Sequence, residues 1–212
     1  FSEYGPTQSI PFEHQVDCLF AYVLKKVPKT ASLKIVGHSY GGAIAMALAA
    51  RLLQRYEKVY LVLAAPYVYR LEDYYSKSRR FLTGTFAKTI NDSLTDPWLK
   101  NTWIKHTTRQ LESEPGEPAD FLRAKQAWAA LVGIRTFHAG QWIPALAGIS
   151  SVDLIVAEKD QLVPKGQLAE LDRMLKSQKF KYQSHLIRNS THDIPRDDSG
   201  LLLRLILSQG LI

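Results

Sequence analysis

The sequence predicts an α/β fold in which a mostly parallel sheet is interrupted by a helical insertion. Short apolar runs rich in branched residues alternate with segments of helical periodicity towards both ends of the 212-residue chain. Between them, residues 65–147 contain no convincing buried strand. Strands joined by helices pair in parallel, because a helical crossover returns the chain to the same edge of the sheet. We therefore expect a core formed by residues 1–64 and 148–212, and a helical lid formed by residues 65–147.

The first half of this core has the order helix, strand, helix, strand. Apolar residues recur every three or four positions over 9–26, which predicts a helix with Pro11 in its first turn. Residues 33–37 and 58–64 are short apolar runs typical of buried strands. The segment 43–56 between them consists mainly of strong helix formers.

The same alternation resumes after the insertion. Residues 152–157 and 182–188 predict two further strands, and residues 165–177 predict the helix between them. A last helix is predicted over residues 198–208. Because parallel strands all end at one edge of a sheet, the loops that follow these strands are expected to lie near one another.

The composition argues against several classes of function. The net charge of +7 is spread without a basic run of five or more residues, which disfavours nucleic-acid binding. A lone Cys18 can form neither an internal disulfide nor a cysteine-rich zinc site, and the six His are scattered, so we expect no metal and no cofactor. No apolar run reaches the ~18 residues needed to cross a membrane. We expect a cytoplasmic protein without a membrane partner.

A glycine-rich hexapeptide lies between a predicted strand and a predicted helix. Residues 37–42 read Gly-His-Ser-Tyr-Gly-Gly and fit the pattern G-x-S-x-G in the strand–turn–helix context that gives it meaning. A serine at such a sharp turn is strained, and glycines at both ends, Gly37 and Gly41, remove Cβ atoms that would clash. Ser39 would then project above the carboxyl edge of the sheet, beside the partial positive charge of a helix N-terminus. His38 within the motif is expected to be structural or to line the pocket.

A serine hydroxyl is a poor nucleophile and needs a base, which in turn needs an orienting acid. Asp160 follows the third predicted strand and His192 follows the fourth, so both lie on loops at the same edge as Ser39. Asp153 and Asp193 are rival acids. However, Asp193 adjoins His192 in the chain, and Asp153 lies inside a predicted strand, so loop placement favours Asp160.

Three segments, IVGHSYGG, LIVAEKDQLVP and NSTHDIP, resemble the α/β-hydrolase superfamily. Their chain order of Ser, Asp and His is the order of that superfamily. The resemblance implies that Ser39 is the nucleophile, His192 the base and Asp160 the acid. It also implies that the N–H of Tyr40 is one oxyanion donor, and that Gly37, His38, Gly41 and Gly42 complete the nucleophile elbow.

The sheet of that superfamily has eight strands, and the resemblance covers only the last four. The sequence therefore corresponds to the C-terminal half of an α/β-hydrolase sheet with an inserted helical lid. The loop that normally supplies the second oxyanion N–H belongs to the other half. The outer edge of residues 33–37 would be left open, which native proteins avoid. We expect the absent N-terminal strands to be supplied by a longer parent chain or by a second chain.

The resemblance implies hydrolysis of an ester, thioester or related acyl bond through an acyl-enzyme, with a small to medium, largely apolar substrate. Lid aromatics such as Trp98, Trp103 and Trp128 are candidate substrate contacts, although aromatic residues also pack cores. Two alternatives stay open. One is a catalytically silent ligand receptor or interaction domain, and the other is an acyltransferase or lyase that uses the same three residues.

Overall fold

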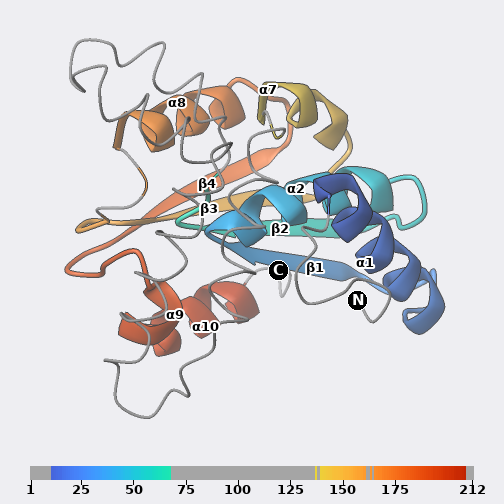
Figure 1. The fold of residues 1–212 in the computed structure, drawn as a ribbon, viewed down its shortest axis with the longest axis horizontal. Coiled ribbons are helices and arrows are strands. Elements are labelled where there is room, and N and C mark those ends of the chain that lie inside the picture. The colour runs from blue at the N-terminus through green and yellow to red at the C-terminus, as the bar shows by residue number, and fades with distance from the viewer. Residues whose placement is uncertain (1–10, 68–136, 138, 161–162, 164, 209–212) are drawn as a thin grey trace, which may run out of the picture. The chain divides into compact units, whose positions relative to one another are not determined.

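The computed structural model describes residues 11–67, 137, 139–160, 163 and 165–208 (Figure 1). The chain divides into two compact units, Phe1–Gln15 with Tyr69–Phe137 and Val16–Val68 with His138–Ile212. The second unit contains the sheet. Most of the expected lid, including Trp98, Trp103 and Trp128, lies outside the described residues.

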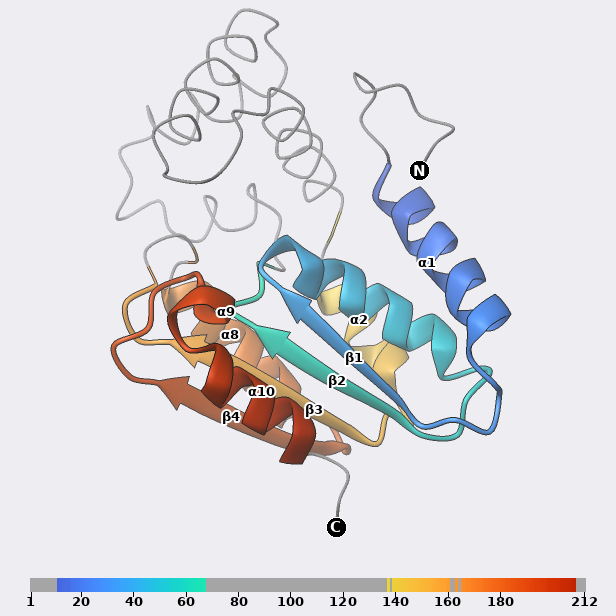
Figure 2. The ribbon, with the colours of Figure 1, turned by 90° about the horizontal axis from the view of Figure 1, so that it is seen from below.

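The second unit is built on a four-stranded sheet in which the spatial order of the strands equals their order in the chain. The strands are β1 (Leu33–His38), β2 (Val59–Ala64), β3 (Ser151–Ala157) and β4 (Lys181–Ile187). All three neighbouring pairs are parallel, which confirms the predicted sheet. Figure 2 shows the strands side by side, with their carboxyl ends at one edge.

Helices cover both faces of the sheet. The helical elements are α1 (Phe12–Lys26), α2 (Tyr40–Leu52), α7 (Ala139–Trp142), the short 3₁₀ turn η1 (Pro144–Leu146), α8 (Lys165–Lys176), α9 (Ile194–Asp197) and α10 (Ser199–Ser208). In Figures 1 and 2, α9 and α10 lie on one face of the sheet, and α2, α7 and α8 lie on the other. Helix α10 confirms the predicted final helix, whereas the short helix α9, separated from it by Asp198, was not predicted.

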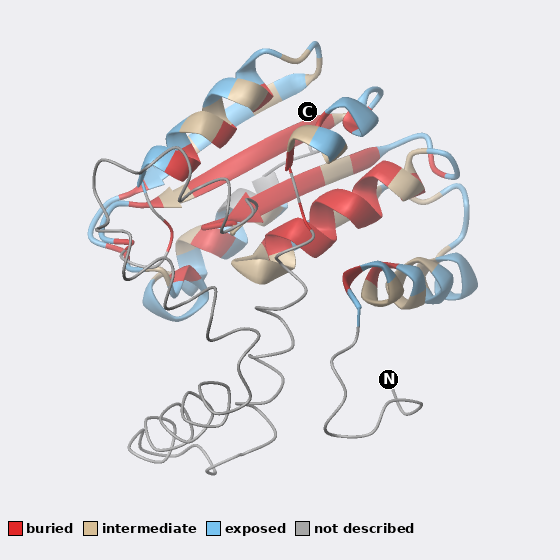
Figure 3. Ribbon diagram, turned by 45° about the horizontal axis from the view of Figure 1, so that its top comes forward, coloured by how far each residue is buried: buried red, intermediate tan, exposed pale blue. Residues whose placement is uncertain are grey.

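Helix α2 is the most deeply buried helix of the described part of the chain. Ten of its thirteen residues are buried, and it packs on β1 and β2 and against α7 and η1. Its alanine-rich sequence permits this, because small side chains let a helix approach a sheet closely on several sides. Figure 3 shows the buried residues concentrated in this helix and in the central strands. The residue that precedes α2 is consequently held by a rigid, buried helix on one side and, on the other, by the end of β1, which is paired with β2.

The opposite face of the sheet is closed by α9 and α10. Val62, Ile155 and Ile187 on three neighbouring strands pack with Ile194 of α9 and Leu202 of α10 in one buried cluster. Burying such side chains contributes roughly 1.5–3 kcal/mol each, so this cluster anchors the segment that follows β4. The loop between β4 and α9 is thereby fixed at both of its ends.

The outer edge of β1 has no partner strand among the described residues, since β1 pairs there with β2 alone. Val36 on this strand is 42% exposed. Coverage of this edge by a further strand remains a prediction from the sequence. None of the helices in the described ranges combines the length and the apolar character that a membrane crossing requires.

Candidate active site

Ser39 occupies the sharp turn between β1 and α2, with φ 52° and ψ −125°. A positive φ is unfavourable for a residue with a Cβ atom and costs about 1–3 kcal/mol, so the surroundings must impose it. Three main-chain hydrogen bonds do so. The N–H of Ser39 donates to the carbonyl of Ala64 at 3.0 Å, and its carbonyl accepts from the N–H groups of Gly42 at 2.9 Å and Tyr67 at 3.0 Å. The turn is thus tied to the end of β2 as well as to its own helix.

The glycines around this turn have different roles. A Cβ at Gly37 would lie 2.3 Å from the carbonyl oxygen of Gly41 and 2.6 Å from the Cβ of Ala45, which confirms the expected clash there. At Gly41 the expected clash is not found, because no described atom beyond its chain neighbours and the backbone of its own helix lies within 4 Å of an added Cβ. The second crowded position is Gly42, where a Cβ would lie 2.6 Å from the Cβ of Pro66. Sequence reasoning assigned the close approach to the wrong glycine of the pair.

The three residues predicted from separate loops meet at the carboxyl edge of the sheet. The Oγ of Ser39 lies 2.8 Å from Nε2 of His192, and Nδ1 of His192 lies 2.9 Å from Oδ2 of Asp160. A carboxylate can only accept a hydrogen bond, so Nδ1 carries the proton and Nε2 is left to accept from the hydroxyl. The hydroxyl, the imidazole and the carboxylate therefore form one continuous hydrogen-bonded chain.

The Asp160 carboxylate is almost completely enclosed, with 1% of its side chain exposed. Its Oδ1 accepts the main-chain N–H of Val163 at 2.9 Å, while its Oδ2 accepts from His192. A buried carboxylate is stable only when its oxygens are hydrogen-bonded, and both oxygens are. The imidazole of His192 is 15% exposed, so it is less completely enclosed than the carboxylate.

The loop that carries His192 is held by neighbouring contacts. The main-chain N–H of Thr191 donates to Oδ2 of Asp197 at 2.7 Å, and its hydroxyl donates to the same oxygen. These hydrogen bonds from Thr191 lower the pKa of the Asp197 carboxyl below its ordinary value. The carbonyl of Ser190 accepts the N–H of Lys159 at 2.9 Å, which links this loop to the loop that carries Asp160.

The two rival acids lie elsewhere. Asp153 is a buried residue of β3, and its Oδ1 lies 2.8 Å from Nε2 of His185 on β4. Asp193 is exposed and precedes α9, where its carbonyl accepts the N–H groups of Arg196 and Asp197. The structure therefore brings Asp160, rather than either rival, to the ring of His192.

The remaining predicted positions also belong to this edge. Tyr40 is the first residue of α2, so its N–H is part of the helix N-terminus that follows Ser39. His38 makes a contact that sequence reasoning did not foresee, because its Nε2 lies 2.7 Å from the carbonyl oxygen of His192. Nothing in the sequence links two residues so far apart in the chain.

Two other features of the described residues bear on what this site can bind. No group of three or more His, Cys, Asp and Glu side chains there could hold a metal ion. A cavity of about 390 Å³ lies between α8 and the ends of β3 and β4. It is lined by Asp160 but by neither Ser39 nor His192, so the hydroxyl does not open into it.

The model of the Alpha/beta hydrolase family matches residues 5–203. The chain belongs to the alpha/beta hydrolase family. The match includes the turn at Ser39 and the loops that carry Asp160 and His192. It therefore agrees with the resemblance found in the sequence, and the parallel sheet with helices on both faces is of this family's fold.

Solved structures of this family share the fold at low sequence identity. A thermophilic esterase from Thermogutta terrifontis is 17% identical with a TM-score of 0.62, over 95% of this chain and 72% of that chain. MGS-M2, an alpha/beta hydrolase enzyme from a Medee basin deep-sea metagenome library, is 19% identical with a TM-score of 0.59, over 95% and 72%. The thioesterase domain from the curacin biosynthetic pathway is 17% identical with a TM-score of 0.55, over 96% and 74%. None of the curated proteins matches the sequence at a significant level.

Proposed function

We propose that this alpha/beta hydrolase is a serine hydrolase that cleaves an ester, thioester or related acyl bond through an acyl-enzyme. One observation carries the proposal, namely the hydrogen-bonded chain from Ser39 Oγ through the His192 ring to Asp160, with separations of 2.8 and 2.9 Å. These are the separations at which a base can take a proton from a nucleophile and an acid can orient that base.

In the first half of the reaction, Ser39 Oγ attacks the acyl carbonyl while Nε2 of His192 takes its proton. The imidazolium that forms is stabilised by the Asp160 carboxylate, which is enclosed and already hydrogen-bonded to Nδ1. The oxyanion of the tetrahedral intermediate lies near the start of α2, where the N–H of Tyr40 donates to it. His192 then gives its proton to the leaving alcohol or thiol, and the acyl group remains on Ser39.

In the second half, a water molecule takes the place of the leaving group. His192 removes a proton from the water, and the resulting hydroxide attacks the acyl carbonyl. The second tetrahedral intermediate collapses with return of the proton to Ser39 Oγ, which releases a carboxylic acid. Each step uses only Ser39, His192, Asp160 and a main-chain N–H, so no cofactor or metal is required.

Family membership supports the hydrolase class, whereas the substrate class is inferred from the sequence. The similar structures include an esterase and a thioesterase domain, but at 17% identity they support the fold alone. The preference for a small to medium, apolar acyl group rests on the aromatic residues of the segment 65–147, Trp98, Trp103 and Trp128 among them.

The strained turn at Ser39 favours an enzyme over a silent receptor. Three main-chain hydrogen bonds hold Ser39 at φ 52°, which costs free energy, and a nucleophile that must face a base is served by such a fixed position. An acyltransferase or lyase that uses the same three residues would differ from a hydrolase in whether water reaches the acyl-enzyme.

The proposal is tested with p-nitrophenyl esters and acyl thioesters of increasing chain length, on the wild type and on Ser39→Ala. The control is Ser177→Ala, which removes an exposed hydroxyl beyond the end of α8. We expect Ser39→Ala to lose roughly 10⁴-fold or more in kcat, with the control unchanged. An Ser39→Ala variant as active as the wild type would contradict the proposal. An added alcohol acceptor should leave the free acid as main product, and predominant transfer to the alcohol would indicate the acyltransferase.

A further inference from the structure

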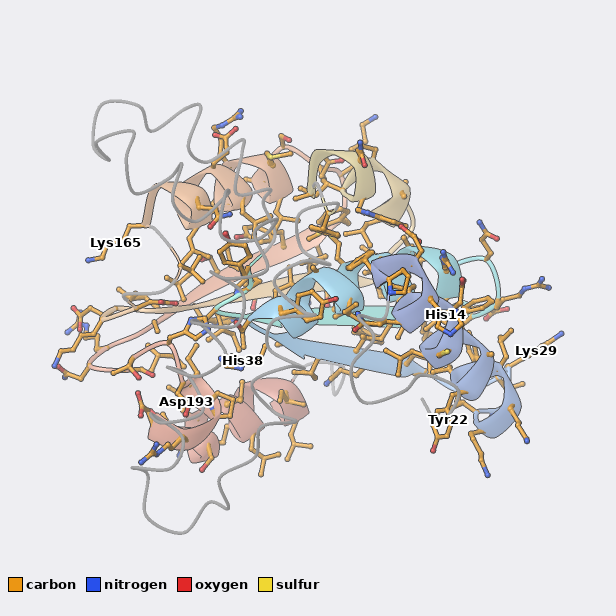
Figure 4. The ribbon with its side chains drawn as sticks, in the orientation of Figure 1. His14, Tyr22, Lys29, His38, Lys165 and Asp193 are labelled. Carbon is orange, nitrogen blue, oxygen red and sulfur yellow. The ribbon has the colours of Figure 1, made fainter. Side chains whose placement is uncertain are left out.

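The ring of His38 contacts the main chain of the proposed base. His38 is the last residue of β1, and its Nε2 lies 2.7 Å from the carbonyl oxygen of His192. The centroids of the two imidazole rings are 5.1 Å apart, with their planes at 43°. Figure 4 shows His38 on the side of the sheet that faces α9. Asp193, which directly precedes α9, is labelled in the same view. The ring therefore reaches from the end of β1 to the loop between β4 and α9.

The chemistry of this contact defines the state of His38. A carbonyl oxygen only accepts hydrogen bonds, so Nε2 of His38 must carry the proton. In the neutral ring the other nitrogen, Nδ1, is then unprotonated, and in the charged ring both nitrogens carry a proton. The hydrogen bond to His192 persists in either state, which makes it a constant feature of the site.

This hydrogen bond holds the main chain of His192 itself, whereas the other described contacts of this loop belong to the neighbouring residues, such as the N–H of Asp193, which donates to the Thr191 hydroxyl at 3.4 Å. Within the described ranges, the N–H and the carbonyl of His192 take part in no other hydrogen bond. Asp160 holds the ring through Nδ1, and Thr191 before it is anchored by Asp197. A ring held only through its nitrogens can still shift together with its loop, whereas a ring whose main chain is also fixed stays opposite Ser39.

We infer that His38 is a positioning residue for His192, which it holds in register with Ser39 through the hydrogen bond to the His192 carbonyl. The inference rests on the proposed function. His38 directly precedes Ser39, so one short piece of backbone positions the nucleophile and, through this bond, also the base. The 2.8 Å separation between Ser39 Oγ and His192 Nε2 is thereby fixed by a contact of the residue next to Ser39, rather than by the packing of the whole sheet.

The competing explanation is that the His38 ring only fills space beside His192. Two substitutions separate the alternatives. His38→Gln removes the ring but places an amide N–H where Nε2 lies, so it retains the hydrogen bond. His38→Phe retains a ring of similar size and removes the donor. If the Phe variant fails to fold, as judged by its thermal transition, His38→Leu takes its place.

The test compares kcat and KM of the two variants on one ester. We expect His38→Phe to lose roughly 10- to 100-fold in kcat with little change in KM, because a base displaced by less than an ångström is a poor proton acceptor while substrate binding is untouched. We expect His38→Gln to stay within about threefold of wild type. The reverse order, with Phe tolerated and Gln impaired, would overturn the inference in favour of ring packing.

A second readout does not depend on activity. In protein labelled with ¹⁵N-histidine, the Nδ1 proton that His192 shares with Asp160 gives its own resonance. This resonance should broaden and exchange faster with water in His38→Phe and stay sharp in His38→Gln. An unchanged resonance in His38→Phe overturns positioning even when the wild type is active. If the wild type is inactive and the resonance still broadens in His38→Phe, the proposed function is contradicted while the positioning role of His38 stands.

Discussion

Substitution of the elbow glycines by alanine should have opposite effects at two positions only four residues apart. In Gly37→Ala the new methyl would lie 2.3 Å from the carbonyl oxygen of Gly41 and 2.6 Å from the Cβ of Ala45. The first distance must grow to at least 3.0 Å, and the nearest obstacle is main chain that cannot rotate away. The start of α2 and the end of β1 must therefore separate, and Ser39 lies between them.

The cost follows from these distances. Forcing an extra methyl into a packed site costs typically 1–3 kcal/mol, and a backbone obstacle places Gly37→Ala at about 3 kcal/mol. For a chain of 212 residues, that corresponds to a fall in Tm of roughly 6–12 °C. Gly41→Ala is the matched control, because no described atom beyond its chain neighbours and the backbone of its own helix lies within 4 Å of its added Cβ. Alanine is the better helix former, so Tm should be unchanged or rise by up to about 4 °C.

The assay is thermal unfolding followed by circular dichroism, together with the rate of ester hydrolysis. Gly37→Ala should also lose activity at temperatures where it remains folded, since relief of the clash moves the Ser39 hydroxyl away from the ring of His192. A Gly37→Ala variant as stable as the wild type would refute this reasoning. Equal destabilisation by Gly37→Ala and Gly41→Ala would also refute it, because it would show that glycine is needed here for the start of the helix rather than for close packing.

Three further predictions follow from individual contacts. Asp160→Asn should lower kcat by about 10⁴-fold, because an amide in place of the carboxylate favours the wrong tautomer of the histidine, whereas Asp193→Asn should leave kcat unchanged. Asp197→Asn should make the free energy of unfolding less dependent on pH in the acidic range. Hydrogen bonds from Thr191 lower the pKa of Asp197 in the folded state below 3.8, its ordinary value. The contribution of this carboxylate to the free energy of unfolding is therefore complete above pH 3.8, and it is lost as the pH falls through the lower pKa of the folded state. Urea midpoints at neutral and acidic pH would measure this, and parallel curves for the two proteins would contradict it. Finally, Ser39→Gly should be more stable than Ser39→Ala by about 1 kcal/mol in urea unfolding, because glycine accepts φ 52° without strain; equal stability would mean that the turn is not strained.

The parallel sheet and the meeting of three loops could be predicted because both depend on patterns that are local in the chain. A short apolar run before a helical segment indicates a buried parallel strand, and residues that directly follow such strands share one edge. Ser39, Asp160 and His192 each carry that signal. The result needs no knowledge of side-chain conformation, because the sheet itself brings the loops together.

What could not be predicted depends on distances between residues far apart in sequence. The contact between His38 and His192 joins residues 154 positions apart and depends on the path of one loop. The pairing of Asp153 with His185 depends on the register of β3 with β4, in which Asp153 lies opposite Gln183 rather than His185. The crowding at Gly42 instead of Gly41 depends on Pro66, which comes from the chain after β2.

Labelling by a fluorophosphonate probe, followed by mass spectrometry of the intact protein and of its peptides, measures whether Ser39 is an activated nucleophile. Such probes react with a serine only when a neighbouring base activates it. We expect a single adduct, located on Ser39, that is absent from Ser39→Ala and forms far more slowly in His192→Ala. A folded wild-type protein that takes no adduct, or an adduct that persists in Ser39→Ala, would contradict this expectation.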